Sequence, residues 1–147
     1  MHIITITRKT TAKPEMIWEL WANVEKRTRW DDSLEYARAG GPFQLGMVGG
    51  VKLKGQPERK YEIRECVPLK KYTDRFFLPM GGKMDWVHSI KEVEGGYEVT
   101  FDISASGPTS FLLGPIMKNI LGRELPPTVE KLVAIAEKPE TASTENA

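Results

Sequence analysis

Histidine is the side chain best suited to acid–base chemistry near neutral pH, and this chain of 147 residues has two histidines. His2 adjoins the N-terminus. His88 lies in the segment 83–93, where Trp86, His88 and Ile90 fall on one face of a strand by period two. We therefore predict that His88 points to the same side as Trp86. Three interpretations stay open for His88: a hydrogen-bonded core or rim histidine, a ligand contact, or a weak candidate for a catalytic acid or base.

No pairing of a nucleophile with a base is evident around this histidine. Ser89 adjoins His88 but points to the opposite face of the strand, and nothing marks Ser104 as activated, so a serine hydrolase is not predicted. Two distant histidines and one cysteine, Cys66, give no spacing of metal ligands. We predict no metal and no cofactor, and we interpret Cys66 as a part-buried, inert thiol.

Three further motifs have simple structural interpretations. The pair Asp31-Asp32 fits a helix cap or a solvated turn. The glycines between positions 40 and 50 match neither phosphate-loop pattern, so they indicate turns or bulges in a bent sheet. The run 52–60 carries four cations and one carboxylate, net +3. It fits a solvated hairpin tip, with attraction of an anionic ligand or a membrane surface as the alternative.

Aromatic side chains give the most informative pattern in this sequence. Tyr72 and Phe76 share a strand face by period two, and Met117 and Leu121 of the C-terminal helix are placed to oppose them. A close-packed core is the alternative for each residue. We favour an apolar pocket in which tyrosine hydroxyls, Arg75 and His88 supply the polar groups. The predicted ligand-binding residues are Trp30, Tyr61, Tyr72, Arg75, Phe76, Trp86, His88, Phe101, Met117 and Leu121.

Periodicity predicts the elements that must position these residues. An amphipathic helix over 14–24, begun by Pro14, follows a first strand, and a second short helix or turn over 25–32 holds Trp30 inward. The predicted strands cover 2–8, 34–39, 46–54, 58–67, 70–78, 83–93 and 97–105. Helical spacing then extends from Phe111 to Ala136. We expect Gly114-Pro115 and Pro126-Pro127 to kink or restart this helix.

Composition bounds the class of protein. A 40% hydrophobic and 28% charged composition fits one globular domain, predicted over 1–137, with a disordered tail over 138–147. A net charge of +1 gives no support for a nucleic-acid partner. No apolar run approaches the roughly 18 residues of a membrane span, so we predict no integral membrane segment. The N-terminus lacks a signal-peptide pattern, and a single cysteine permits no internal disulfide, so we expect a cytoplasmic protein.

Several motifs in their order resemble the START-like helix-grip superfamily, also called SRPBCC, which includes Bet v 1-type allergens and polyketide cyclases. The first of the motifs that carry this resemblance are Ile-Thr-Arg-Lys-Thr-Thr-Ala-Lys-Pro-Glu-Met-Ile-Trp and, after it, the pair Trp30-Asp31. Gly-Tyr-Glu-Val-Thr-Phe, and Ser-Gly-Pro leading into an apolar helix that ends in Ala-Ile-Ala-Glu, complete the set. The resemblance covers about residues 2–137. The pair Pro126-Pro127 departs from the pattern of this superfamily, because the last helix of its members is usually continuous.

The resemblance implies an α+β fold. A curved antiparallel sheet of about six or seven strands wraps around a long C-terminal helix, and two short helices follow the first strand. It also implies an internal cavity between sheet and helix that binds a small hydrophobic or amphipathic molecule. In that case, replacing Trp86 or Phe101 by a smaller residue is expected to change ligand size preference more than the fold.

Two other functions stay open beside ligand binding. A polyketide cyclase or aromatase would use the same cavity, with His88, Arg75 or a tyrosine moving protons. An interaction module resembling the Hsp90 co-chaperone branch would need an exposed apolar patch on the outer face of the sheet. The polar outward residues Glu98 and Asp102 argue against that module. A homodimer through an exposed strand edge is also left open.

Overall fold

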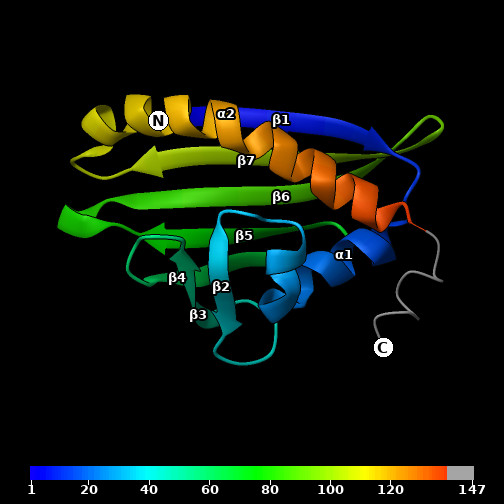
Figure 1. Cartoon of the computed structure of the whole chain (residues 1–147), viewed down its shortest axis with the longest axis horizontal. Helices are drawn as coiled ribbons and strands as arrows, with labels where there is room; N and C mark the ends of the chain where they lie inside the picture. The colour runs from blue at the N-terminus through cyan, green and yellow to red at the C-terminus, as the bar shows by residue number, and fades with distance from the viewer. Residues whose placement is uncertain (139–147) are drawn as a thin grey trace.

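The alternating segments of the sequence pair into one antiparallel sheet in the computed structural model, which describes residues 1–138 (Figure 1). The strands are β1 (His2–Thr10), β2 (Leu34–Ala39), β3 (Val48–Leu53), β4 (Arg59–Val67), β5 (Lys71–Phe77), β6 (Lys83–Val93) and β7 (Gly96–Ser106). Their order in the sheet is β1-β7-β6-β5-β4-β3-β2, so every neighbouring pair except β1 and β7 is consecutive in the chain. Each strand begins and ends within two residues of its predicted bounds.

Two short helices follow β1, as predicted. Helix α1 (Pro14–Ala22) starts with proline at its first turn, where the missing N–H has no partner to lose, and buries Ile17, Leu20 and Trp21. The next turn, η1 (Val24–Arg29), is a 3-10 helix. The indole Nε1 of Trp30 donates a hydrogen bond to the Leu20 carbonyl at 3.0 Å, which ties the end of η1 back to α1. A short 3-10 turn, η2 (Pro79–Gly81), joins β5 to β6.

The long C-terminal helix α2 (Ser110–Ala136) crosses the inner face of the sheet beside β1 and β7 and reaches α1 (Figure 1). It is one helix, so of the two predicted alternatives, a kink or a restart at the prolines, the restart is wrong. Each proline leaves the carbonyl four residues earlier without its helical donor. Those carbonyls belong to Phe111, Gly122 and Arg123, which are exposed residues where water is available.

The buried side of α2, opposite these exposed residues, explains why the helix stays continuous across its prolines. It packs against the sheet with side chains that are almost fully buried, namely Leu121, Leu125, Val129, Leu132 and Val133. Burial of each large apolar side chain contributes about 1.5–3 kcal/mol. Together these contacts outweigh the backbone bonds that the prolines remove. The sheet and this helix form the α+β helix-grip architecture that was predicted.

The two faces of the sheet differ in polarity. On the inner face, toward α2, Val99, Phe101 and Ile103 are buried. On the outer face, residues between them bond across strands: the Thr5 hydroxyl donates to the Asp102 carboxylate at 2.9 Å. Thr7 and Thr100 are likewise linked at 3.0 Å. The outer face near β1 and β7 is therefore polar, in agreement with the sequence pattern.

The predicted tail 138–147 lies outside the described residues except for Lys138, which is exposed just after α2. Within residues 1–138, no helix has both the length and the apolar character needed to cross a membrane.

Candidate ligand-binding site

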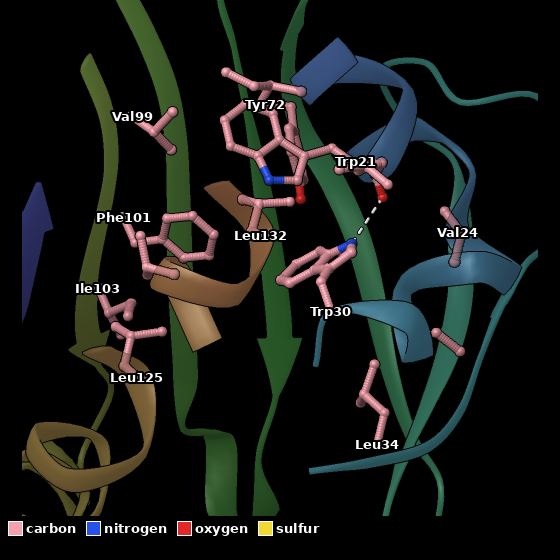
Figure 2. Close-up of a cluster of buried hydrophobic side chains, with 14 of the residues drawn as sticks. Trp21, Val24, Trp30, Leu34, Tyr72, Val99, Phe101, Ile103, Leu125 and Leu132 are labelled. Atoms are coloured by element: carbon pink, nitrogen blue, oxygen red, sulfur yellow. Dashed lines mark hydrogen bonds between the residues drawn. The ribbon is translucent and has the colours of Figure 1, made fainter. Parts of the chain in front are cut away.

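Aromatic rings fill the inner face where β5, β6 and β7 meet α1 (Figure 2). The ring of Tyr72 stacks on the ring of His88, with centroids 4.1 Å apart and planes at 4°. Phe101 meets His88 at 4.6 Å, and Trp21 meets Tyr72 at 5.3 Å. Strand register explains the arrangement, because Tyr72 lies opposite His88 and His88 lies opposite Phe101. Three strands and one helix thus contribute to one buried cluster.

A buried ion pair lies beside these rings. Arg27 of η1 donates from Nη1 to Oδ2 of Asp74 at 3.2 Å, and from Nε to the carbonyl of Trp21 at 3.0 Å. The side chains of Arg27 and Asp74 are only 6% and 3% exposed. The guanidinium carbon lies 5.3 Å from the centroid of the Tyr72 ring, within cation–π range. We define the polar cluster as Arg27, Tyr72, Asp74 and His88.

Burial and charge set the ionisation of the polar cluster. Burial lowers the pKa of His88 well below its usual value, and the nearby charge of Arg27 lowers it further. Burial raises the pKa of Tyr72 well above its usual value. Burial also raises the pKa of Asp74, while its pairing with Arg27 opposes that rise. At neutral pH the cluster therefore holds a neutral imidazole, a neutral phenol and an ion pair with no net charge.

The pKa of His88 leads to a prediction for the pH dependence of stability. The unfolded chain binds a proton at His88 near pH 6.5, whereas the folded chain does not, so stability falls as pH drops below about 6.5. We expect a loss of about 1 kcal/mol between pH 6.5 and 5.5, with a slope that steepens toward about 1.4 kcal/mol per pH unit at lower pH. Urea denaturation at several pH values measures it. His88→Gln should flatten this slope; equal slopes for wild type and His88→Gln would refute the prediction.

Several buried polar atoms in and around the polar cluster lack a hydrogen-bond partner within the described part of the chain. They are Trp21 Nε1, Arg27 Nη2, Tyr72 OH, Asp74 Oδ1, Trp86 Nε1 and His88 Nδ1. A buried polar atom without a partner destabilises a protein by about 1–3 kcal/mol, and most native proteins hold few of them. Their concentration on one inner face marks the place where a bound molecule with polar groups would be stabilised.

Further along the same face, the aromatic side chains become partly exposed. Phe76 and Trp86 point inward like Tyr72 and His88, with their ring centroids 6.0 Å apart, yet solvent reaches both. Tyr61 joins the two regions, because its ring lies 5.9 Å from Phe76. Burial raises the pKa of Tyr61 to about 12, and its hydroxyl donates to a backbone carbonyl. The inner face thus has a buried polar end and a partly open apolar end.

The structure brings most of the predicted binding residues together. Seven of them form a chain of aromatic contacts across the inner face: Trp30, Phe101, His88, Tyr72, Trp86, Phe76 and Tyr61. On α2, Leu121 is buried and Met117 is half-buried against the same core. Arg75 lies apart from them. Its guanidinium makes a bidentate pair with Asp85 at 2.8 and 2.9 Å, on the opposite face of the sheet.

Sequence reasoning missed five residues of this site. Asp74 carried a usable signal, because a carboxylate between Tyr72 and Phe76 at period two must share their face. Arg27 sits in the charged run 25–29, which has the composition of a solvated turn, and only the tertiary fold buries it. Trp18 and Trp21 lie in the predicted amphipathic helix 14–24, whose periodicity does not show which strands it contacts. Phe43 follows Gly-Gly-Pro in a loop, where no periodicity shows its direction.

A surface hollow of about 560 Å³ lies at the end of the sheet near the start of α1. It is lined by Val67, Leu69, Lys70, Ile90 and Tyr97, among others. None of the predicted binding residues lines it, so it is distinct from the inner-face site.

The chain is similar in structure to several solved proteins. The di-domain ARO/CYC protein StfQ, from the steffimycin biosynthetic pathway, matches with a TM-score of 0.77 at 9% identity, over 97% of this chain and 52% of that chain. SA2116 from Staphylococcus aureus, a protein of unknown function, matches with a TM-score of 0.72 at 13% identity, over 98% and 97%. The Aha1 dimer from Colwellia psychrerythraea matches with a TM-score of 0.63 at 15% identity, over 92% of this chain and 98% of that chain.

At these identities the matches show the fold, which is the helix-grip fold. The sequence matches no protein-family model and no curated protein.

Proposed function

We propose that this protein binds a small hydrophobic or amphipathic molecule on the inner face of the sheet, beneath α2. The apolar part of the ligand contacts Phe76, Trp86 and Met117, and its polar part faces the polar cluster. Removal of apolar surface from water supplies most of the binding free energy, at about 25 cal/mol per Å². One or two hydrogen bonds fix the orientation of the ligand.

A single observation carries this proposal. Phe76 and Trp86 leave part of their aromatic surface in contact with solvent, although they point to the inside of the sheet. The neighbouring Tyr72 and His88 bury polar atoms that have no partner in the described chain. Exposed aromatic surface next to unpaired polar atoms is the arrangement that an amphipathic ligand complements.

The proposal is tested by titration with a neutral, apolar fluorescent probe such as N-phenyl-1-naphthylamine. Phe76→Ala and Trp86→Ala should each weaken probe binding by about fivefold or more, because each removes apolar contact surface. Phe77→Ala is the matched control, since Phe77 adjoins Phe76 on the same strand but points to the outer face, where Lys60 lies 5.0 Å from its ring centroid.

Native mass spectrometry of freshly purified protein gives a second, independent measurement. An apolar molecule released on denaturation, at one equivalent per chain, would support binding and identify the class of ligand.

The probe titration can contradict the proposal. If Phe76→Ala and Trp86→Ala bind N-phenyl-1-naphthylamine as tightly as the wild type and Phe77→Ala do, the inner face is not the binding site and the proposal fails.

A cyclase or aromatase activity is the second candidate, and one observation favours it. His88 Nδ1 and Tyr72 OH are both unpaired and belong to stacked rings, so two proton-transfer groups lie close together. Positioning of a reactive chain would supply most of the rate. The test is conversion of a linear poly-β-ketone to a cyclised product with loss of water, followed by mass spectrometry. Cyclisation that persists in both His88→Gln and Tyr72→Phe would remove these residues from the reaction.

A further inference from the structure

Phe43 lies between the polar cluster and solvent. Its ring packs edge-to-face on Tyr72, with centroids 5.0 Å apart, and on Trp18 at 5.8 Å. The guanidinium carbon of Arg27 is 5.9 Å from the Phe43 centroid. Tyr72 and Arg27 are buried, whereas Phe43 and Trp18 are partly exposed. A molecule that approaches the polar cluster from this side therefore meets the Phe43 ring or the Trp18 ring.

The loop that carries Phe43 holds its other residues away from the core. Within 40–46, Phe43 is the one residue that is not exposed. A Cβ at Gly41 would have no heavy atom within 4 Å, so the backbone there is free of close packing. Displacing the Phe43 ring thus requires movement of a loop that is open at Gly41 and held at its ends, by the close approach of Gly40 to the Val48 carbonyl and by the hydrogen bond that the Gly46 N–H donates to the Ile63 carbonyl at 2.8 Å. Trp18, by contrast, is carried by α1, a helix fixed by three buried side chains.

The charges beneath Phe43 restrict what can take its place. Arg27 is already paired with Asp74, so the polar cluster has no surplus charge to offer a ligand. A second buried anion would face the Asp74 carboxylate, and a cation would face Arg27, without compensation in either case. The unpaired atoms nevertheless include donors, such as Arg27 Nη2, and acceptors, such as Asp74 Oδ1. A neutral group that both donates and accepts complements this set.

From this geometry we propose that the ligand of the inner face places a neutral, hydroxyl-bearing aromatic ring where the Phe43 ring lies. Its hydroxyl bonds to Arg27 Nη2, Tyr72 OH or Asp74 Oδ1, and the rest of the molecule extends along Phe76 and Trp86. This inference rests on the function proposed above and adds to it the chemical class of the ligand.

Three probes with the same apolar body test the proposal on the wild-type protein by isothermal titration calorimetry at pH 7. They are 4-butylphenol, which is neutral at this pH, 4-butylbenzoate, which is an anion, and butylbenzene, which has no polar group. We expect the phenol to bind about tenfold or more tightly than either of the others, because only the phenol pairs the buried polar atoms without adding charge.

Two variants separate the contributions of Phe43 and of charge balance. Phe43→Ala should bind 4-butylphenol about tenfold more tightly than wild type, because no ring must be displaced and the truncation leaves space of its size. Asp74→Asn leaves the Arg27 charge unbalanced, so it should shift the preference toward 4-butylbenzoate by about tenfold. Leu45→Ala is the matched loop control, since Leu45 is 66% exposed, and it should bind like wild type.

Each result has one meaning. If the wild-type protein binds 4-butylbenzoate as tightly as the phenol, the polar cluster accepts an anion and the proposed ligand class is wrong. If butylbenzene binds as tightly as the phenol, the inner face binds apolar molecules without using the polar cluster, so the proposed function stands and this inference fails. If none of the three probes binds, this inference fails, and the titration with N-phenyl-1-naphthylamine decides the proposed function separately. The comparison of the three probes on the wild-type protein tests this inference even if Asp74→Asn does not fold.

Discussion

Arg27→Met is expected to lower the free energy of unfolding by about 3–5 kcal/mol, the cost of leaving one member of a buried ion pair without its partner. Asp74 is 2% exposed in the native protein and its Oδ2 is 3.2 Å from Arg27 Nη1. After the substitution the carboxyl must stay buried without compensation or become protonated. The variant also removes the donor to the Trp21 carbonyl. Urea denaturation at pH 7 measures the loss.

The double variant Arg27→Met with Asp74→Leu distinguishes a lost charge partner from lost packing. Apolar residues of similar volume often replace a buried ion pair at little net cost, so most of the stability should return. Lys52→Met, which breaks the surface pair with Glu35, is the control and should change stability by less than about 1 kcal/mol. A double variant as unstable as Arg27→Met alone would show that the guanidinium acts mainly through packing.

Phe101→Ala is expected to lower the free energy of unfolding by about 3–5 kcal/mol, the usual cost of removing a large buried aromatic ring. Phe101 is 1% exposed and meets the rings of Trp21, Trp30 and His88. These neighbours belong to α1, to the turn after η1 and to β6, so they cannot close together to fill the space. This result would reverse, for Phe101, the expectation from sequence that a smaller residue affects ligand size more than the fold.

Trp86→Ala provides the comparison for Phe101→Ala. Trp86 lies on the same inner face but keeps part of its surface in solvent, so its removal should cost roughly half as much. Thermal denaturation of both variants, together with binding of the neutral probe, separates the two roles. If Phe101→Ala is as stable as wild type while Trp86→Ala is not, the assignment of Phe101 to the core and Trp86 to the binding surface is wrong.

Local pattern in the sequence determined the elements and much of the inner face. Period-two alternation placed Trp86 beside His88, and the structure confirms that their rings stack at 6.4 Å. The same period places Asp74, and not Arg75, on the face of Tyr72 and Phe76. The structure accordingly buries Asp74, whereas Arg75, which was predicted to lie in the pocket, pairs with Asp85 on the outer face. The order of β2 to β7 follows from hairpins between neighbours in the chain, whereas the pairing of β1 with β7 does not.

Only the tertiary structure decided which charged residue is buried, which ring covers the polar cluster, and how α2 behaves at its prolines. Arg27 belongs to a charged turn, and its burial depends on Asp74, 47 residues later in the chain. Phe43 follows glycines and proline in a loop, so no repeat fixes its direction, and contacts with Trp18 and Tyr72 set it. The prolines lower local helix stability, but packing of Leu125 and Leu132 against the sheet keeps α2 continuous. In each case the deciding interaction joins residues far apart in the chain, and local periodicity carries no information about such pairs.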